Sequence, residues 1–375
     1  MDNMGFEDIL MDGETIFNNM EAFNPDYIPP NYNFRDKQME ALAISLRPAL
    51  RNGRPINSII VGQCATGKTT AVKIIFEKLE HSSNKLVCAY VNCQMHTTRF
   101  GIFSQIHKKI FGYAPPETGV PFSKVYEKIM KHLSDNNQGL IVALDEVNYL
   151  LQNQTLNKVF YDILRANEEF EGLRTGIFPI ISDIEFRLAL DMNVNSVFSP
   201  QEIIFPPYSR GEILDILKDR VKEGFYPNVI SNDIIEEITD YTLNSEDLRL
   251  GINLLRIVGN NAEADAAKVI EQKHLDEAIA SNASINLSKI IKNLNNREKQ
   301  LLQLIAENPD FNKSGELSKE FKKKTNASYS TFIRAIEKLE ALRLIDTKYT
   351  GKGVRGNSRD INLKFNPNEV CRCIL

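Results

Sequence analysis

Residues 61–70 read VGQCATGKTT, in which Gly62, Gly67, Lys68 and Thr69 satisfy the pattern G-x-x-x-x-G-K-[ST]. A loop of this kind wraps its backbone N–H groups around phosphate oxygens, so it needs glycine where a side chain would obstruct or strain the turn. The sequence predicts a buried strand, NSIIVGQ, before the loop and a helix, KTTAVKIIFEKLE, after it, which favours a phosphate loop over a structural turn. The residues expected to contact the nucleotide are Gly62, Ala65, Thr66, Gly67, Lys68, Thr69, Thr70 and Ala71.

The catalytic half of such a site is an acidic residue at the end of another buried strand. Lys68 is expected to reach the outer phosphates, and the Thr69 hydroxyl to bind Mg²⁺. The stretch LIVALDE provides Asp145 to hold Mg²⁺ and Glu146 to polarise the attacking water. An Asp-Glu pair after a strand is also a common helix cap, but together with the upstream loop it predicts an ATP site.

Apolar strands alternate with helices through the first half of the chain. KLVCAYVNC and GIFPIIS are further predicted strands, and this alternation is typical of an α/β domain with a parallel sheet covered on both faces. After FSPQEIIFPPYS the pattern is helical only. The predicted organisation is a flexible N-terminus over 1–25, a nucleotide-binding domain over 26–205, an all-helical lid over 206–286 and a third domain over 287–375.

Composition and charge limit the class of protein. The 375 residues are 42% hydrophobic, which suits a globular chain, and no apolar run is long enough to span a membrane, so the expected location is cytoplasmic. The five cysteines show no zinc-binding spacing. The net charge of −4 hides an asymmetry, because residues 288–375 carry 18 Lys and Arg against 10 Asp and Glu, a net +8. A basic C-terminal domain on an acidic body indicates a polyanionic partner.

The C-terminal pattern is that of a winged helix-turn-helix. Three amphipathic helices, NNREKQLLQLIAEN, SGELSKEFKKKTN and SYSTFIRAIEKLEALRLI, precede a strand, a Gly-rich basic loop and a second strand. In such a domain the third helix enters the major groove of duplex DNA and the hairpin lies along the backbone or minor groove. A winged helix can also dock on a protein, and the three lysines 322–324 are either a backbone clamp or a solvated face. The predicted DNA contacts are Tyr329, Ser330, Thr331 and Arg334 on the third helix, and Lys352, Arg355 and Arg359 in or beside the hairpin.

The order of these features resembles a known class. An Asp-Glu pair, Ser182 at the end of the next strand and then an all-helical domain resemble AAA+ ATPases. The segments YIPPNYNFRDKQMEAL, GVPFSKVYEKI, PQEIIFPPYSRGEILDILKDRV and EDLRLGINLLRIVGNNAEADA narrow this to the archaeal ORC-type replication initiators, relatives of the eukaryotic origin-recognition and Cdc-type proteins. The resemblance covers about residues 26–365.

The resemblance implies further site residues. Arg249 matches the lid arginine that senses the nucleotide phosphates, and Tyr208 and Arg220 match lid positions that contact the nucleotide. Ser182 stands where the family usually has a phosphate-sensing asparagine, and Asn193 where a basic residue is common. The catalytic set is then Lys68, Asp145, Glu146, Ser182 and Arg249, with weak hydrolysis expected. Tyr208 could instead simply pack against its neighbouring prolines, and Arg220 could be a solvated charge.

A second DNA contact is implied by the resemblance alone. In the family a short helical insertion in the ATPase domain touches DNA, and the matching positions here are Val120, Pro121, Phe122 and Lys124. The composition of this segment is nearly neutral, and a packed loop is the alternative.

The combined prediction is an ATP-binding initiator that recognises origin duplex DNA and uses its nucleotide state as a slow switch. Its implied partners are origin DNA, the replicative helicase and paralogous initiators, with action at the nucleoid. Two alternatives stay open: an ATP-gated transcription regulator, and a remodelling ATPase whose winged helix docks on a protein.

Overall fold

The structure is a computed structural model of the whole chain. It describes residues 15–152, 155–182, 190–308, 313–342, 344–349 and 359–374. The contacts between residues divide the chain into two compact units, Met1–Ile270 and Glu271–Leu375. None of the helices in the described ranges is both long and apolar enough to cross a lipid bilayer.

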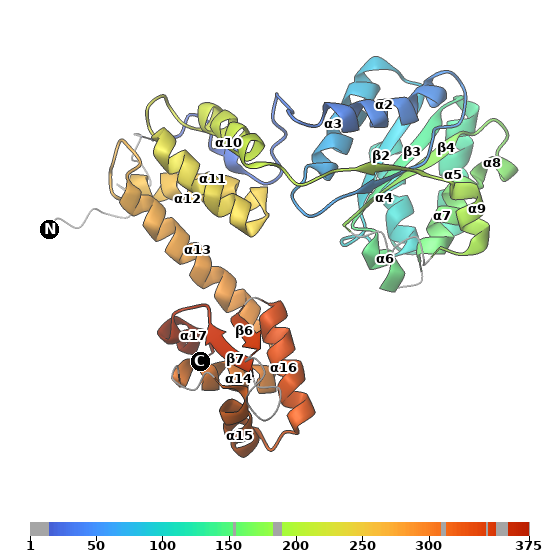
Figure 1. Cartoon of the computed structure of the whole chain (residues 1–375). Coiled ribbons are helices and arrows are strands. Elements are labelled where there is room, and N and C mark those ends of the chain that lie inside the picture. Colours follow the sequence, from blue (N-terminus) through green and yellow to red (C-terminus); the bar gives the residue numbers. More distant parts are fainter. Residues whose placement is uncertain are drawn as a thin grey trace. The chain divides into compact units, whose positions relative to one another are not determined.

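A parallel five-stranded sheet forms the centre of the first unit (Figure 1). Its order is β2-β3-β4-β1-β5. Four of these strands are the predicted ones, and β5 is an additional edge strand that the sequence did not reveal. The bounds are β1 Ser58–Val61, β2 Leu86–Asn92, β3 Gly139–Asp145, β4 Thr175–Ile181 and β5 Gln201–Ile204.

Helices cover both faces of this sheet, as the apolar strand sequences predicted. In β3, Leu140, Val142 and Leu144 belong to the core shared with helices α4, α5, α7 and α9, whereas Ile141 and Ala143 belong to the core shared with α2 and α3. Figure 1 shows these two groups of helices on the sheet. Full burial of β3 and β4 on both faces explains why their sequences are continuous apolar runs. The helices are α2 Asp36–Leu50, α3 Lys68–Ser82, α4 Arg99–Phe111, α5 Phe122–Asp135, α6 Asn148–Gln152, α7 Leu156–Leu164, α8 Ala166–Glu169 and α9 Met192–Phe198.

The strand register brings the predicted site residues to one edge. Asn92 pairs with Asp145, Asp145 with Ile180, and Val61 with Ile181. The carboxyl ends of the parallel strands therefore meet, and ligands of open α/β sheets bind outside that edge.

Three helices follow the sheet and form the lid: α10 Arg210–Gly224, α11 Asn232–Ser245 and α12 Leu248–Ala264. A capping box starts α10, in which the Ser209 hydroxyl accepts from the Glu212 backbone N–H and the Glu212 carboxylate accepts from the Ser209 N–H. The helices pack through buried side chains such as Leu217, Ile238 and Leu254.

The lid core also contains residues from the start of the chain, Thr15–Tyr27, here called the N-terminal strap. The strap includes the short 3₁₀ helix η1 (Met20–Phe23), and the Phe17 ring stacks on Phe225 with centroids 5.1 Å apart. A Cβ added to Gly224 would lie 2.2 Å from the Phe23 ring, and one added to Gly259 would lie 2.4 Å from the Phe17 ring. Both glycines are therefore required for the strap to approach the lid helices this closely.

This packing corrects the expectation of a flexible N-terminus as far as residues 15–25 are concerned. The apolar positions of the strap are few and lie among asparagines and glutamates, but Phe17, Ala22 and Phe23 are buried. Burial of two aromatic rings supplies the favourable free energy that orders this polar stretch.

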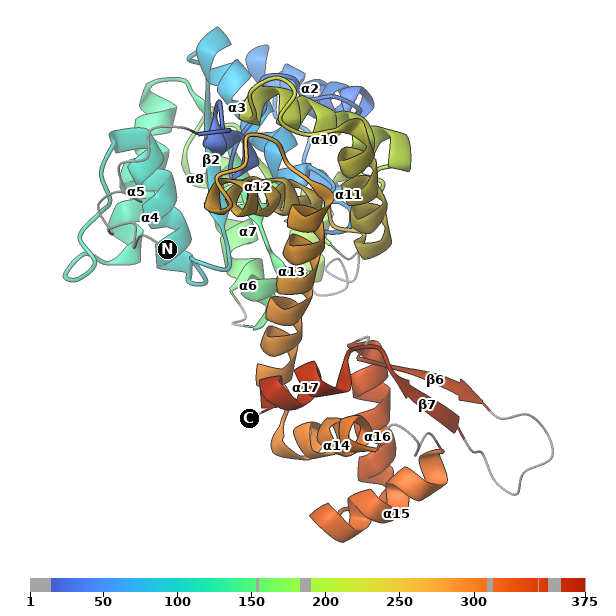
Figure 2. The ribbon, with the colours of Figure 1, turned by 90° about the vertical axis from the view of Figure 1, so that its left-hand side faces the viewer.

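The second unit contains three helices followed by a two-stranded antiparallel hairpin, the arrangement that a winged helix requires (Figure 2). Apolar residues at helical spacing in the predicted amphipathic helices, Leu301, Leu302, Phe332, Ile336 and Leu339, are all buried in one apolar cluster. The boundary at 286/287 falls inside a helix, because α13 is continuous across it. The elements are α13 Gln272–Lys292, α14 Asn296–Glu307, α15 Ser314–Thr325, α16 Tyr329–Ala341, β6 Ile345–Tyr349, β7 Arg359–Leu363 and α17 Pro367–Ile374.

Candidate nucleotide site and DNA-binding surface

The loop between β1 and α3 has the backbone of a phosphate cradle. Ala65 and Gly67 adopt the left-handed conformation, with φ of 59° and 91°. A Cβ added to Gly62 would lie 2.4 Å from the Phe205 carbonyl oxygen, and one added to Gly67 would lie 2.6 Å from the Tyr32 hydroxyl. Both glycines are thus sterically required, and the loop leads directly into the N-terminus of α3, where backbone N–H groups are available to an anion.

Lys68 is the first residue of α3 and is buried. Its Nζ donates to the carbonyl oxygens of Gly62 (2.6 Å) and Gln63 (2.7 Å), so the ammonium lies across the loop. Burial lowers the pKa of Lys68, while the neighbouring Cys64, Asp145 and Glu146 oppose that shift. An anion beside Nζ would favour the charged lysine further.

Asp145 accepts hydrogen bonds from three sides. Its Oδ2 accepts from the Thr69 hydroxyl (2.7 Å) and the Tyr90 hydroxyl (2.8 Å), and its Oδ1 accepts from the Glu146 backbone N–H (3.0 Å). Burial and the Asp145 carboxylate raise the pKa of Tyr90, so the phenol remains a donor. The structure therefore joins the two residues predicted to bind Mg²⁺, Thr69 and Asp145.

The two remaining catalytic candidates of the sheet lie at the same edge. Glu146 follows β3 with an exposed side chain and a left-handed backbone, φ 55°. Ser182 directly follows β4, the strand between β3 and β1, and is exposed. The left-handed backbone of Glu146 is strained for a non-glycine residue, and such strain often occurs at functional sites.

A group of three side chains joins the loop to the segment that leads into the lid. The Arg35 guanidinium donates to the carbonyl oxygens of Thr66 (3.1 Å) and Pro206 (2.8 Å) and lies 3.7 Å from the centroid of the Tyr208 ring. The Tyr32 hydroxyl donates to the Gly67 carbonyl oxygen (2.7 Å). Tyr208 is thus beside the loop, as the family resemblance implied.

The two predicted lid arginines have different surroundings. Arg249, in the first turn of α12, is exposed, and its charge adds to the lowering of the Lys68 pKa that burial mainly causes. Arg220 is buried on α10 and donates to the carbonyl oxygens of Ala22 (3.0 Å) and Tyr27 (3.4 Å). Burial lowers the pKa of Arg220. Its hydrogen bonds hold the strap, which the sequence analysis did not foresee.

Arg35, Tyr32 and Tyr90 were missed by reasoning from the sequence. Arg35 and Tyr32 lie in the segment NYNFR, which is part of the family resemblance, and Tyr90 lies in a strand whose sequence predicts only apolar packing. No spacing rule signals any of them, because their partners are distant in the sequence.

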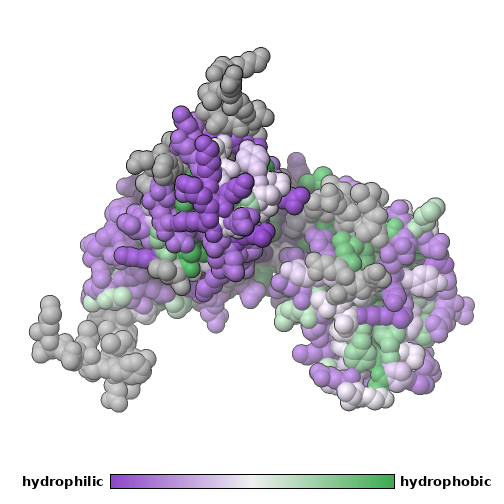
Figure 3. Space-filling model, turned by 90° about the horizontal axis from the view of Figure 1, so that it is seen from below, coloured by the Kyte–Doolittle hydropathy of each residue, from purple (hydrophilic) through white to green (hydrophobic). Residues whose placement is uncertain are grey.

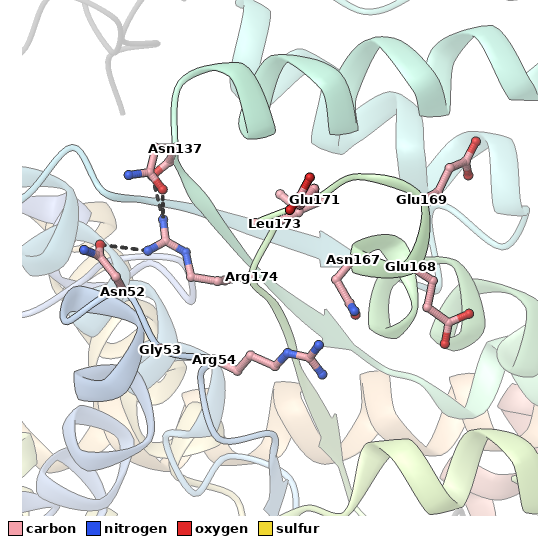
Figure 4. Close-up of a pocket in the computed structure, with 11 residues that line it drawn as sticks. Asn52, Gly53, Arg54, Asn137, Asn167, Glu168, Glu169, Glu171, Leu173 and Arg174 are labelled. Atoms are coloured by element: carbon pink, nitrogen blue, oxygen red, sulfur yellow. Dashed lines mark hydrogen bonds between the residues drawn. The ribbon is translucent and has the colours of Figure 1, made fainter.

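A cavity of about 800 Å³ lies at the opposite, amino edge of the sheet (Figure 4). There the buried Arg174 guanidinium donates to the side-chain oxygens of Asn52 and Asn137. These bonds tie together loops at the start of the strands, away from the phosphate loop. The cavity is therefore separate from the candidate nucleotide site.

Relatives of known family provide an independent comparison. The chain is 57% identical over 366 residues to ORC1-type DNA replication protein 2 of Methanothermobacter thermautotrophicus, covering 98% of this chain and 97% of the relative. It is 42% identical over 367 residues to the protein of the same name in Methanosarcina acetivorans, covering 98% of each chain. The chain belongs to the ORC1-type DNA replication proteins.

Other comparisons with this ORC1-type chain agree. Residues 214–280 match the family model of the Cdc6 AAA+ ATPase-type lid domain. The solved structure of the Aeropyrum pernix ORC1 protein in complex with DNA is similar over 96% of this chain and 97% of its own, with a TM-score of 0.73 and 26% identity. The Aeropyrum pernix ORC2 protein, solved as ADPNP-ADP complexes, covers 96% of this chain and 97% of its own, with a TM-score of 0.69 and 24% identity, which supports the fold.

These findings confirm the AAA+ fold and the ORC-type family predicted from the sequence, and they identify a DNA replication protein. They favour neither the transcription regulator nor the remodelling ATPase.

In this ORC1-type chain, the predicted DNA-contacting side chains begin α16. Ser328 caps the helix, Tyr329, Ser330 and Arg334 are exposed, and Thr331 is half-buried. The Tyr329 ring is 58% exposed and stacks on Phe332, which fixes it on the surface. Figure 3 shows that one face of the second unit, Glu271–Leu375, is largely hydrophilic. Lys352 and Arg355 lie outside the described residues, whereas Arg359 begins β7, with its backbone N–H bonded to the Ser314 hydroxyl.

The lysines 322–324 of α15 are all exposed, but two of them are paired. Lys323 bonds Glu320 (2.6 Å) and Lys324 bonds Glu307 (3.1 Å). Exposed ion pairs of this kind contribute about 0–1 kcal/mol, so phosphates could replace the carboxylates.

The segment 120–124 contains the end of the loop before α5 and the first turn of that helix. Phe122 and Val120 are half-buried and pack against the apolar core; the Phe122 ring centroid lies 5.1 Å from that of Phe103 and 3.8 Å from the Arg99 guanidinium. Pro121 and Lys124 are exposed. Pro121 and Lys124 are therefore the more accessible of the four predicted positions to a DNA backbone.

Proposed function

We propose that this ORC1-type chain binds ATP or ADP with Mg²⁺ at the β1–α3 loop and binds origin duplex DNA, with the nucleotide state acting as a slow switch. The observation that best supports nucleotide binding is the Thr69–Asp145 hydrogen bond (2.7 Å) beside the phosphate loop. The DNA half is supported by membership of the family and by the polar surface of α16.

Each residue of the nucleotide site has a role in this proposal. The loop N–H groups and Lys68 bind the phosphates, and Thr69 and Asp145 hold Mg²⁺, which when bound neutralises phosphate charge. Glu146, exposed at the same edge, orients and polarises a water molecule. Arg249 brings a second positive charge from the lid, so phosphate binding pulls the lid towards the loop.

Slow turnover follows from two side chains. Ser182, at the end of β4, has a shorter reach than the amide usual in the family, and Asn193, at the exposed start of α9, carries no charge to offer a neighbouring subunit. A switch needs only a difference in binding between nucleotide states, which slow hydrolysis preserves. Its readout would be recruitment of the replicative helicase, alone or with paralogous initiators.

DNA retention tests the proposed origin recognition. The full-length protein is incubated with sheared genomic DNA from its source, with ATP or ADP and at moderate salt, and the retained fragments are sequenced. We expect a few strong sites in an intergenic AT-rich region beside replication genes. Many sites before unrelated genes would instead indicate a regulator, and no enrichment would mean that the winged helix serves a protein partner.

Arg334→Ala is expected to weaken duplex binding and its salt dependence. Arg334 is exposed on α16, and loss of one phosphate contact lowers the slope of log K against log salt by about 0.9. Anisotropy with a labelled duplex at several salt concentrations measures this. The matched control is Arg297→Ala, an exposed arginine on α14. Equal effects of the two variants would mean that α16 does not face the DNA.

A further inference from the structure

Tyr90 contacts the predicted Mg²⁺ ligand Asp145 from the neighbouring strand. It lies on β2 two residues before Asn92, the register partner of Asp145 on β3, so the two side chains are diagonal neighbours on one face of the sheet. An aromatic side chain is long enough to span that diagonal, and the Tyr90 hydroxyl donates to Asp145 Oδ2 at 2.8 Å.

The hydrogen bonds of Asp145 are unevenly divided between its two oxygens. Each carboxylate oxygen has about two acceptor sites. Oδ2 uses both, for Thr69 (2.7 Å) and Tyr90 (2.8 Å), whereas Oδ1 accepts one bond, from the Glu146 N–H (3.0 Å). The remaining acceptor capacity of Asp145 is therefore on Oδ1.

The Tyr90 ring is itself held in place. The ring packs partly buried against the core between the sheet and α2 and α3, and Lys73 Nζ lies 5.2 Å from its centroid. Lys73 is one helical turn after Thr69 on α3, so the phenol is fixed between the helix that carries Thr69 and the strand that carries Asp145.

We propose that Tyr90 is a positioning residue for the cation: it fixes the Asp145 carboxylate so that Oδ2 stays bound to the protein and Oδ1 faces the metal and its water ligands. This inference rests on the proposed Mg²⁺-nucleotide site. Partners in the outer shell of a metal site orient its ligands in this way, and their loss typically costs about 10–100-fold in metal affinity.

A Mg²⁺ titration of full-length protein with a fluorescent ADP analogue tests the proposal. Tyr90→Phe removes one oxygen and keeps the ring. Mg²⁺ is expected to increase the affinity for the nucleotide. We expect the Mg²⁺ concentration that gives half of this increase to rise about 10-fold in the variant, while nucleotide affinity in EDTA stays within about twofold of wild type.

Two comparisons separate positioning from general packing. Tyr126→Phe is the matched control, because the Tyr126 hydroxyl donates to the Asp162 carbonyl oxygen (3.0 Å) elsewhere in the same domain. In an Asp145→Asn background, Tyr90→Phe should have no further effect on the Mg²⁺ midpoint. An unchanged Mg²⁺ midpoint in Tyr90→Phe would overturn the inference and leave the nucleotide site intact. Losses of nucleotide affinity that are equal with and without Mg²⁺ would do the same. A wild-type protein that binds no nucleotide would overturn the proposed function itself.

Discussion

Lys68→Met is expected to weaken ATP and ADP binding by roughly 100-fold or more. Two charge-assisted hydrogen bonds to phosphate oxygens, each worth about 1.5–3 kcal/mol, would be lost, and each 1.4 kcal/mol is a factor of ten in affinity. Because Lys68 is buried under the loop and its ammonium already bonds two loop carbonyl oxygens, methionine would keep the stem and remove only the charge. Titration of the full-length protein with a fluorescent nucleotide measures the loss.

The control for this variant lies on the same helix. Lys78→Met changes an exposed lysine of α3, far along the helix from the loop, and should bind nucleotide like wild type. Circular dichroism is the suitable check of folding, because the chain contains no tryptophan. Unchanged affinity in a folded Lys68→Met protein would remove the assignment of the phosphate loop.

The second large effect is expected for Arg35→Ala, a residue that touches no predicted ligand. Arg35 is only 2% exposed, and its removal leaves the carbonyl oxygens of Thr66 and Pro206 without their donor and opens a cavity beneath Tyr208. Unsatisfied buried acceptors cost about 1–3 kcal/mol each, and the cavity adds to this. Relief of the buried positive charge offsets part of the loss, so we expect about 3 kcal/mol of destabilisation.

Urea unfolding followed by circular dichroism measures that change, and hydrogen exchange over residues 62–71 locates it. Faster exchange in the loop should accompany weaker nucleotide binding, because Arg35 bonds both the loop and the segment before the lid. Arg47→Ala, an exposed arginine of α2, the helix that Arg35 immediately precedes, is the control. If loop exchange were unchanged in Arg35→Ala, Arg35 would not join these segments in solution.

Local sequence patterns predicted most of this fold because loop sterics, helical spacing and strand burial each depend on residues that are close in the sequence. The sequence pattern requires glycine at 62 and 67 for steric reasons. The structure confirms this, because an added Cβ would lie 2.4 Å from the Phe205 carbonyl oxygen at Gly62 and 2.6 Å from the Tyr32 hydroxyl at Gly67. Helical spacing selected the inward residues of the C-terminal helices, and apolar runs selected β1 to β4. The edge strand β5 was missed because its burial is partial, with Ile204 60% exposed.

The remaining features depend on contacts between distant residues. Arg35 looks like any charged residue at a helix start, and only the meeting of the loop with the segment before the lid makes it a buried donor. Tyr90 acquires its partner from strand order, which no local pattern encodes. Arg220 matched a family position, but its hydrogen bonds are with the strap, whose apolar residues are too few to form a periodic signal.

The strap also sets the order in which the lid is completed during synthesis. Phe17 leaves the ribosome early, but its partners Phe225 and Gly259 follow only after the whole sheet domain has been made. Contacts of such long sequence separation form late and leave apolar surface exposed until they do. We therefore expect the strap to be the last part of the lid to pack, and a lid produced without residues 15–23 to expose the apolar surface that Phe17 and Phe23 cover.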